Sequence, residues 1–281
     1  MNLFHVLVLA IVQGIAELLP VSSSAHVIVA EKLLGLDPTA PQMTLLLVML
    51  HTGTMFAVIV YFWKSWRASY FSSARQFRTN GAHLFIATAA TGAIGLALLQ
   101  AIKYVVAGNA PGFEIEQLFG NARLMASALA AAGILIILSS RMAVAGKEDV
   151  SMRSALWIGA VQGLCLPFRG FSRSGATIST GLTLGVDRRR AEQFSFALAV
   201  VLTPVVIAKE GYRLYKVDAA SATGDAGALW HAIGPGLLGM FLSFLVGLLA
   251  LRWLSRWLEQ GRWHVFGAYC LFASMVVLWV G

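Results

Sequence analysis

The sequence predicts an all-α integral membrane protein with six transmembrane helices and two re-entrant helical hairpins, arranged as an inverted-topology repeat. Of the 281 residues, 58% are hydrophobic and only 12% are charged. A soluble domain of this size would carry roughly 25% charged residues. Long apolar segments, and two pairs of shorter ones around polar turns, support the same fold class. The composition therefore excludes an ordinary soluble globular protein.

The expected helices fall into two length classes, because about 20 largely apolar residues are needed to cross a bilayer. Long segments lie at 42–63, 82–104, 118–140, 192–213, 228–253 and 263–281. Shorter segments lie at 3–19, 27–36, 152–167 and 176–186. The short segments flank two polar turns, at 20–26 and 169–175. Half-helices that face a polar turn are typical of re-entrant hairpins, whose exposed backbone must be satisfied by protein or by a wet cavity.

The two short pairs are also alike in sequence. Val12-Gln13-Gly14 recurs as Val161-Gln162-Gly163, and the same offset of 149 residues aligns Ser23 with Ser172. An offset shared by several residues indicates an internal repeat.

We therefore expect a single membrane domain over 1–281 that contains two repeats. The first repeat covers 1–140 and begins with the hairpin at 1–36; the second covers 152–281 and begins with the hairpin at 152–187. Each hairpin is followed by three spans, and because three is odd, the second half must enter the membrane upside down. This architecture is typical of many transporters.

The charge distribution tests this topology. The chain has 21 Lys and Arg against 13 Asp and Glu, a net charge of +8. The cations gather in short segments between apolar runs, as in cytoplasmic loops of membrane proteins, so we expect no nucleic-acid partner. In the six-span topology the basic segments share one side, which we expect to be cytoplasmic; they are 64–81, 141–153, 188–190 and 252–262.

Four ionisable residues lie in or beside the two polar turns. Glu17 and His26 belong to the first hairpin, and Arg169 and Arg173 to the second. Charged groups inside a membrane are costly and mark functional sites by default. Packing or helix contact is the alternative for any one of them, but four in two facing turns favour a site.

Hydroxyl groups surround these charges. They are Ser22, Ser23, Ser24, Ser172, Ser174 and Thr177. Helix capping is the ordinary role of such residues. Two helix N-termini that converge beside an arginine also form an anion site, because free N–H groups and the guanidinium both favour negative charge. We expect the ligand to be phosphate or diphosphate.

If the site is catalytic, its hydroxyl and ionisable groups fit a phosphoryl-transfer reaction. A serine nucleophile needs a neighbouring base, and His26 lies one helical turn after Ser23. Arg173 would hold the charge of the transferred phosphoryl group. Glu17 would bind a divalent cation or orient His26.

At these residues the sequence resembles the undecaprenyl-pyrophosphate phosphatase family, also known as bacitracin-resistance proteins. The similarity is strongest at 17–26, which reads ELLPVSSSAH, and at 170–177, which reads GFSRSGAT. Weaker similarity continues through 51–54, 61–63 and 194–196. The resemblance therefore covers nearly the whole chain.

The resemblance implies an enzyme of the bacterial inner membrane that removes the terminal phosphate of undecaprenyl diphosphate and supplies the lipid carrier of peptidoglycan synthesis. It also implies a divalent cation, Mg²⁺ or Ca²⁺, and a site that faces the periplasm or the outer leaflet. By motif position, Ser23 corresponds to the proposed nucleophile and His26 to its partner. Glu17 corresponds to the second glutamate of the family motif, and Arg173 to the phosphate-binding arginine.

The chain departs from the family pattern at three places. Gln13 stands where the family usually has the first glutamate, Arg169 stands where a proline precedes Gly-Phe-Ser, and Gln193 stands where a glutamate precedes Phe-Ser-Phe. These changes make the expected cavity more positive. We expect stronger retention of anions and less reliance on a metal.

Two other classes of function are compatible with parts of this pattern. A polyprenyl-phosphate transporter or flippase would use the same anion site, since broken helices that meet at mid-depth also suit alternating access. A purely structural membrane protein would need neither the serine nor the arginine.

Overall fold

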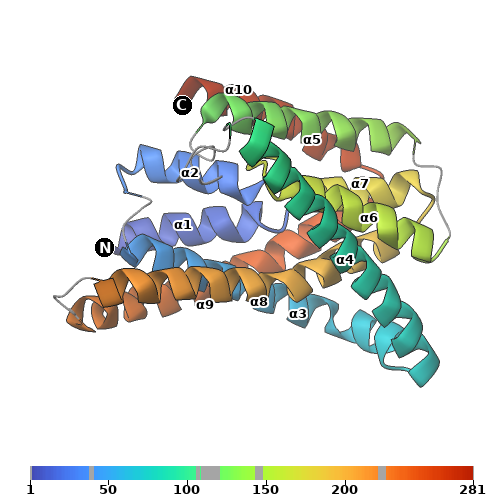
Figure 1. Cartoon of the computed structure of the whole chain (residues 1–281), viewed down its shortest axis with the longest axis horizontal. Helices are drawn as coiled ribbons and strands as arrows, with labels where there is room; N and C mark the ends of the chain where they lie inside the picture. Colours follow the sequence, from blue (N-terminus) through green and yellow to red (C-terminus); the bar gives the residue numbers. More distant parts are fainter. Residues whose placement is uncertain are drawn as a thin grey trace.

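The computed structural model describes residues 2–37, 41–105, 108, 121–142, 148–220 and 226–280. Within these ranges the fold is helical (Figure 1). The helices are α1 (Leu3–Ala16), α2 (Ser23–Leu33), α3 (Pro41–Tyr70), α4 (Ala74–Val105), α5 (Ala122–Met142), α6 (Met152–Cys165), α7 (Arg173–Thr183), α8 (Arg188–Ala220), α9 (Ala226–Glu259) and α10 (Trp263–Val280).

Five helices in the described part of the chain contain stretches long and apolar enough to cross a membrane: α3, α4, α5, α9 and α10. The chain is therefore a multi-pass membrane protein. The expected span at 192–213 lies within α8, which is a long helix but is not one of these five. Residues 118–120 of the third expected span, and 143–147 of a basic segment, lie outside the described residues.

The short helices form two hairpins of matching length. The first hairpin is α1 and α2, with 14 and 11 residues, and the second hairpin is α6 and α7, also with 14 and 11 residues. α2 and α7 begin at Ser23 and Arg173, three to four residues earlier than the sequence predicts. The first helical turns therefore contain Ser23, Ser24, Arg173 and Ser174, and the N-cap residues Ser22 and Ser172 precede them, because helix starts favour such polar residues.

Each hairpin turn contains one residue with a left-handed backbone. Ser22 has φ 67°, the single non-glycine residue with positive φ in the described chain, and Gly170 has φ 103°. Such a conformation costs a serine about 1–3 kcal/mol and persists where the surrounding structure imposes it. A Cβ on Gly170 would also lie 2.3 Å from the carbonyl oxygen of Met125. Both turns are therefore held in one shape by close packing.

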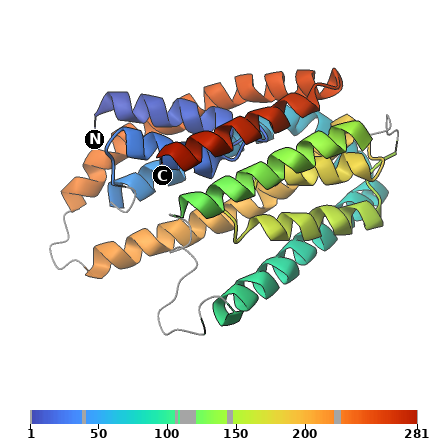
Figure 2. The same ribbon diagram turned by 90° about the horizontal axis from the view of Figure 1, so that it is seen from above.

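Close helix contacts, made possible by small residues, hold the hairpins within the longer helices. α3 packs along α9, α4 along α6, and α5 along α10, and the last pair lies side by side in both views (Figures 1 and 2). A Cβ on Gly133 of α5 would lie 2.8 Å from the carbonyl oxygen of Gly267 of α10. Glycine at such contacts lets backbones approach, as in other membrane proteins.

Polar contacts gather the basic segments at one end of the molecule, as the sequence predicts. Arg190 at the start of α8 pairs with Asp149 before α6 at 2.7 Å, and donates to Ser69 near the end of α3 at 2.6 Å. Arg189 pairs with Glu259 at the end of α9 at 2.6 Å. Partial burial raises the pKa of Asp149, but the hydrogen bonds from Arg190 outweigh it, so this pKa lies below its usual value.

The α4–α6 contact can be tested at Gly159. A Cβ there would lie 2.1 Å from the carbonyl oxygen of Ala87, which is backbone and cannot turn aside. We expect Gly159→Ala to cost about 1–3 kcal/mol by overpacking and to lower the melting temperature of the detergent-solubilised protein. The matched control is Gly92→Ala in α4, where the added Cβ meets open space. Equal melting temperatures for both variants would contradict this packing.

Candidate active site

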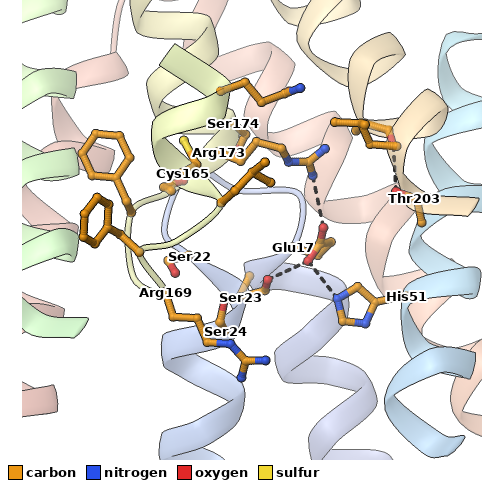
Figure 3. Close-up of a pocket in the computed structure, with 18 of the residues that line it drawn as sticks. Glu17, Ser22, Ser23, Ser24, His51, Cys165, Arg169, Arg173, Ser174 and Thr203 are labelled. Atoms are coloured by element: carbon orange, nitrogen blue, oxygen red, sulfur yellow. Dashed lines mark hydrogen bonds and ion pairs between the residues drawn. The ribbon is translucent and has the colours of Figure 1, made fainter. Parts of the chain in front are cut away.

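The two hairpin turns meet around a cavity of about 340 Å³, which is within the usual size range of ligand pockets (Figure 3). Ser174 of the second hairpin donates to the carbonyl oxygen of Leu19 in the first at 3.4 Å. Residues of α3 and α8, among them His51 and Thr203, complete the wall. The structure therefore brings the two polar turns together, as the sequence predicts.

Glu17 is the centre of the polar contacts in this cavity. Its Oε2 accepts a hydrogen bond from Ser23 Oγ at 2.6 Å and another from Gln13 Nε2 at 3.2 Å. Its Oε1 accepts from Arg173 Nη2 at 3.1 Å. His51 Nε2 lies 3.6 Å from Oε2. One carboxylate thus joins both hairpins and α3.

Local structure places the acid and the hydroxyl face to face. Glu17 is the residue that ends α1, and Ser23 is the first residue of α2, so the turn between them folds the two side chains toward each other. A short hydrogen bond to an ionised group is stronger than a neutral one. The carboxylate is therefore placed to take a proton from Ser23.

The starts of α2 and α7 add partial positive charge. Both helices begin beside the cavity, which Ser22, Ser23, Ser172 and Arg173 line. Ser172 caps α7 by accepting from the backbone N–H of Gly175 at 3.2 Å, whereas Ser22 makes no such cap to α2. Free N–H groups at a helix start attract anions.

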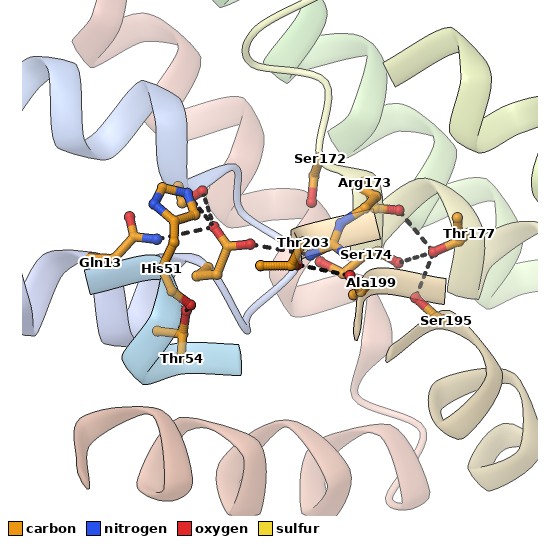
Figure 4. Close-up of polar contacts among 12 residues, drawn as sticks. Gln13, His51, Thr54, Ser172, Arg173, Ser174, Thr177, Ser195, Ala199 and Thr203 are labelled. Atoms are coloured by element: carbon orange, nitrogen blue, oxygen red, sulfur yellow. Dashed lines mark hydrogen bonds and ion pairs between the residues drawn. The ribbon is translucent and has the colours of Figure 1, made fainter. Parts of the chain in front are cut away.

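Most of the residues expected at the site line the cavity. They are Glu17, Ser22, Ser23, Ser24, Arg169, Ser172, Arg173 and Ser174. Thr177 and His26 are not among the lining residues. Thr177 is buried in α7, where its hydroxyl lies 2.8 Å from the carbonyl oxygen of Arg173 and 2.6 Å from Ser195 Oγ (Figure 4).

His26 makes contacts other than the expected one with Ser23. Its Nδ1 lies 2.8 Å from the carbonyl oxygen of Ser22, and its Nε2 lies 2.8 Å from the hydroxyl of Tyr269 in α10. The ring also stacks on Tyr269, with centroids 5.6 Å apart. Glu17, and not His26, is the hydrogen-bond acceptor of Ser23. The one-turn spacing between Ser23 and His26 could not reveal the Tyr269 partner of His26, because Tyr269 lies 243 residues away in the sequence.

Several lining residues were not expected from the sequence. His51 lies in a stretch similar to the family, but its position indicates no function, and Gln162 belongs to the repeated Val-Gln-Gly segment, which indicates a repeat and no role in binding. Thr203 had no sequence signal beyond the proline that follows it. Small and apolar side chains supply the rest of this group: Ala16, Leu19, Cys165, Leu166, Phe168, Phe171, Ala199, Leu202 and Ile207.

The donor set does not fit a resident divalent cation. Glu17 is the one carboxylate among the described lining residues, and both its oxygens already accept hydrogen bonds. Arg173 Nη2 already lies 3.1 Å from Oε1 and supplies a positive charge beside this carboxylate. Gln13 directs its amide N–H toward Glu17 in place of a second carboxylate. The described chain holds no group of three His, Cys, Asp or Glu side chains suited to a metal.

Comparison with known proteins extends over nearly the whole chain. The family model described as bacitracin resistance protein BacA matches residues 6–276. The chain belongs to the BacA family. An undecaprenyl-diphosphatase 2 of Acinetobacter baylyi is 62% identical, with 99% of this chain and 98% of the relative covered.

More distant relatives carry related names. An undecaprenyl-diphosphatase 1 of Burkholderia pseudomallei is 33% identical, over 99% of this chain and 96% of the relative. An undecaprenyl-diphosphatase of Desulfosudis oleivorans is 33% identical, over 98% and 97%. The match includes both hairpins, so the cavity lies within the region shared with these proteins.

Proposed function

We propose that this BacA-family protein hydrolyses undecaprenyl diphosphate to undecaprenyl phosphate and inorganic phosphate. The observation that carries the proposal is the 2.6 Å hydrogen bond from Ser23 to Glu17, inside a cavity that also contains Arg173. The names of the relatives, all undecaprenyl-diphosphatases, support the same reaction. They favour it over the transporter alternative, which needs no activated serine.

The reaction proceeds by two displacements at the terminal phosphorus. Ser23 Oγ attacks this phosphorus while Glu17 takes the hydroxyl proton. The bond from the phosphorus to the bridging oxygen breaks, and the lipid monophosphate leaves with the proton from Glu17. Water then attacks the phosphoserine, gives a proton to Glu17 and releases phosphate, and Ser23 regains its proton.

Positive groups stabilise the phosphoryl charge during both steps. Arg173 carries five N–H donors, so contact with Glu17 leaves others for phosphate oxygens. The helix starts and the remaining polar lining residues bind the rest of the head group. Those residues are Ser22, Ser24, Arg169, Ser172 and Ser174. In this proposal His26 is a positioning residue, which holds the carbonyl group of the strained Ser22.

The membrane topology belongs to the same proposal. The matching lengths of the two hairpins support two repeats, and we infer that the second is inverted. The basic end of the molecule then lies in the cytoplasm of a bacterial inner membrane, and the cavity opens toward the periplasm or the outer leaflet. The apolar lining residues let the lipid tail enter from the membrane side.

The nucleophile and the base can be tested by substitution. We expect Ser23→Ala to abolish phosphate release from undecaprenyl diphosphate by the purified chain, because no hydroxyl remains to attack. Glu17→Gln should lower kcat by about 10²- to 10⁴-fold, the usual contribution of a general base. Ser140→Ala in α5, whose hydroxyl donates within its own helix, is the control. Parent-rate release by Ser23→Ala would refute the mechanism.

Metal dependence can be tested with a chelator. Because Arg173 neutralises Glu17, we expect phosphate release by the parent chain to continue in excess EDTA. Gln13→Glu supplies a second carboxylate beside Glu17 and should make the reaction sensitive to EDTA, with recovery when Mg²⁺ or Ca²⁺ is added. Complete loss of parent activity under chelation would show that the donor set has been misjudged.

A further inference from the structure

Tyr269 of α10 contacts His26 of α2, although the two helices belong to opposite halves of the chain. The Tyr269 hydroxyl lies 2.8 Å from Nε2 of His26. The two rings also stack, with centroids 5.6 Å apart and an interplanar angle of 14°. The stack fixes the plane of the imidazole ring, and the hydrogen bond fixes its rotation within that plane. The proposed reaction uses no residue of α10.

The other ring nitrogen of His26 shows which tautomer this contact favours. Nδ1 lies 2.8 Å from the carbonyl oxygen of Ser22. A carbonyl oxygen only accepts hydrogen bonds, so Nδ1 carries a proton. Nε2 of the neutral ring is then an acceptor, and the hydroxyl of Tyr269 donates to it. A donor at Nε2 therefore favours the tautomer whose Nδ1–H reaches Ser22.

The Ser22 carbonyl belongs to the peptide group that precedes Ser23. It accepts from Nδ1–H of His26, and the backbone nitrogen of His26 donates to the same oxygen at 3.4 Å. Because the peptide group is planar and trans, the N–H of Ser23 points away from this oxygen. An N–H at the start of a helix has no partner within the helix. It therefore points out of the first turn of α2, where Ser22 and Ser23 line the cavity.

The backbone at Ser22 depends on support from its neighbours. Its φ of 67° and ψ of 97° form a conformation that L-residues rarely adopt. Because ψ sets the orientation of the peptide group between Ser22 and Ser23, relaxation at Ser22 would turn the Ser23 N–H. Strained backbone persists only where surrounding groups hold it. His26 is such a group only while its Nδ1–H is directed at the carbonyl oxygen.

We propose that Tyr269 is a positioning residue for the attack by Ser23, an inference that rests on the proposed function. Tyr269 holds His26 in the Nδ1–H tautomer, and His26 holds the peptide group that precedes Ser23. The Ser23 N–H then donates to a phosphoryl oxygen while Oγ of the same residue attacks the phosphorus, because a fixed donor stabilises charge that develops in the transition state. The last helix of the chain thus orients the nucleophile of the first hairpin.

The hydroxyl can be removed while the ring is kept. We expect Tyr269→Phe to lower kcat for phosphate release from undecaprenyl diphosphate by the purified full-length chain about tenfold, as loss of one hydrogen bond does. KM should change by less than about twofold, because Tyr269 is not among the residues that line the cavity. Tyr104→Phe in α4 is the matched control, since this side chain is 61% exposed.

The tautomer of His26 is a readout that a merely structural role would not change. In NMR spectra of the chain labelled with ¹⁵N-histidine, His26 should carry its proton on Nδ1 in the parent and show both tautomers in Tyr269→Phe. The signal is assigned by its absence from His26→Asn. The asparagine amide supplies an N–H near the Nδ1 position, so this variant should keep part of the activity and lose its dependence on Tyr269.

Three results would overturn the positioning role. They are the parent kcat in Tyr269→Phe, an unchanged His26 spectrum in that variant, and an equal effect of Tyr269→Phe in the parent and in His26→Asn. Melting temperatures of all variants identify loss of fold, and the spectra report the tautomer without turnover. Absence of phosphate release by the parent would instead refute the phosphatase reaction, while the spectra would still decide whether Tyr269 sets the tautomer.

Discussion

The Glu17 carboxylate is the interaction on which the site depends. It connects the end of α1, the start of α2 and the start of α7, through Ser23 on one oxygen and Arg173 on the other. Membrane-depth charges are tolerated when they neutralise each other. This pair therefore stabilises the meeting of the hairpins, and in the proposed reaction the same carboxylate prepares the serine hydroxyl for attack. The contacts of Glu17 therefore serve both the fold and the proposed reaction.

The shape of the cavity follows from the way the hairpins are held. Gly170 permits the second turn to pass close to α5, and Ser22 is kept in a strained conformation whose carbonyl oxygen contacts His26. Strain of this kind persists only in rigid surroundings. The Ser23 hydroxyl, the nucleophile of the proposed reaction, is thus fixed by backbone geometry, and the proposed reaction requires little further ordering of this residue.

Much of this arrangement could be predicted from the sequence, because hydrophobic length and the internal repeat are local properties. The hairpins, their meeting and the polar lining residues of the two turns follow from them. Contacts between distant segments do not. The Tyr269 partner of His26 lies 243 residues away, and His51 joins Glu17 only because α3 packs beside the first hairpin. Side-chain spacing along one helix could not decide between Glu17 and His26 as the acceptor of Ser23.

The matching hairpins divide the charges unequally. Where they meet, the first supplies the acid Glu17 and the second supplies the base Arg173. Two copies of the first hairpin would bring together two carboxylates without this cation, and two copies of the second would bring together two guanidinium groups, so electrostatic repulsion opposes either homodimer. The two hairpins are therefore complementary in charge at their meeting point.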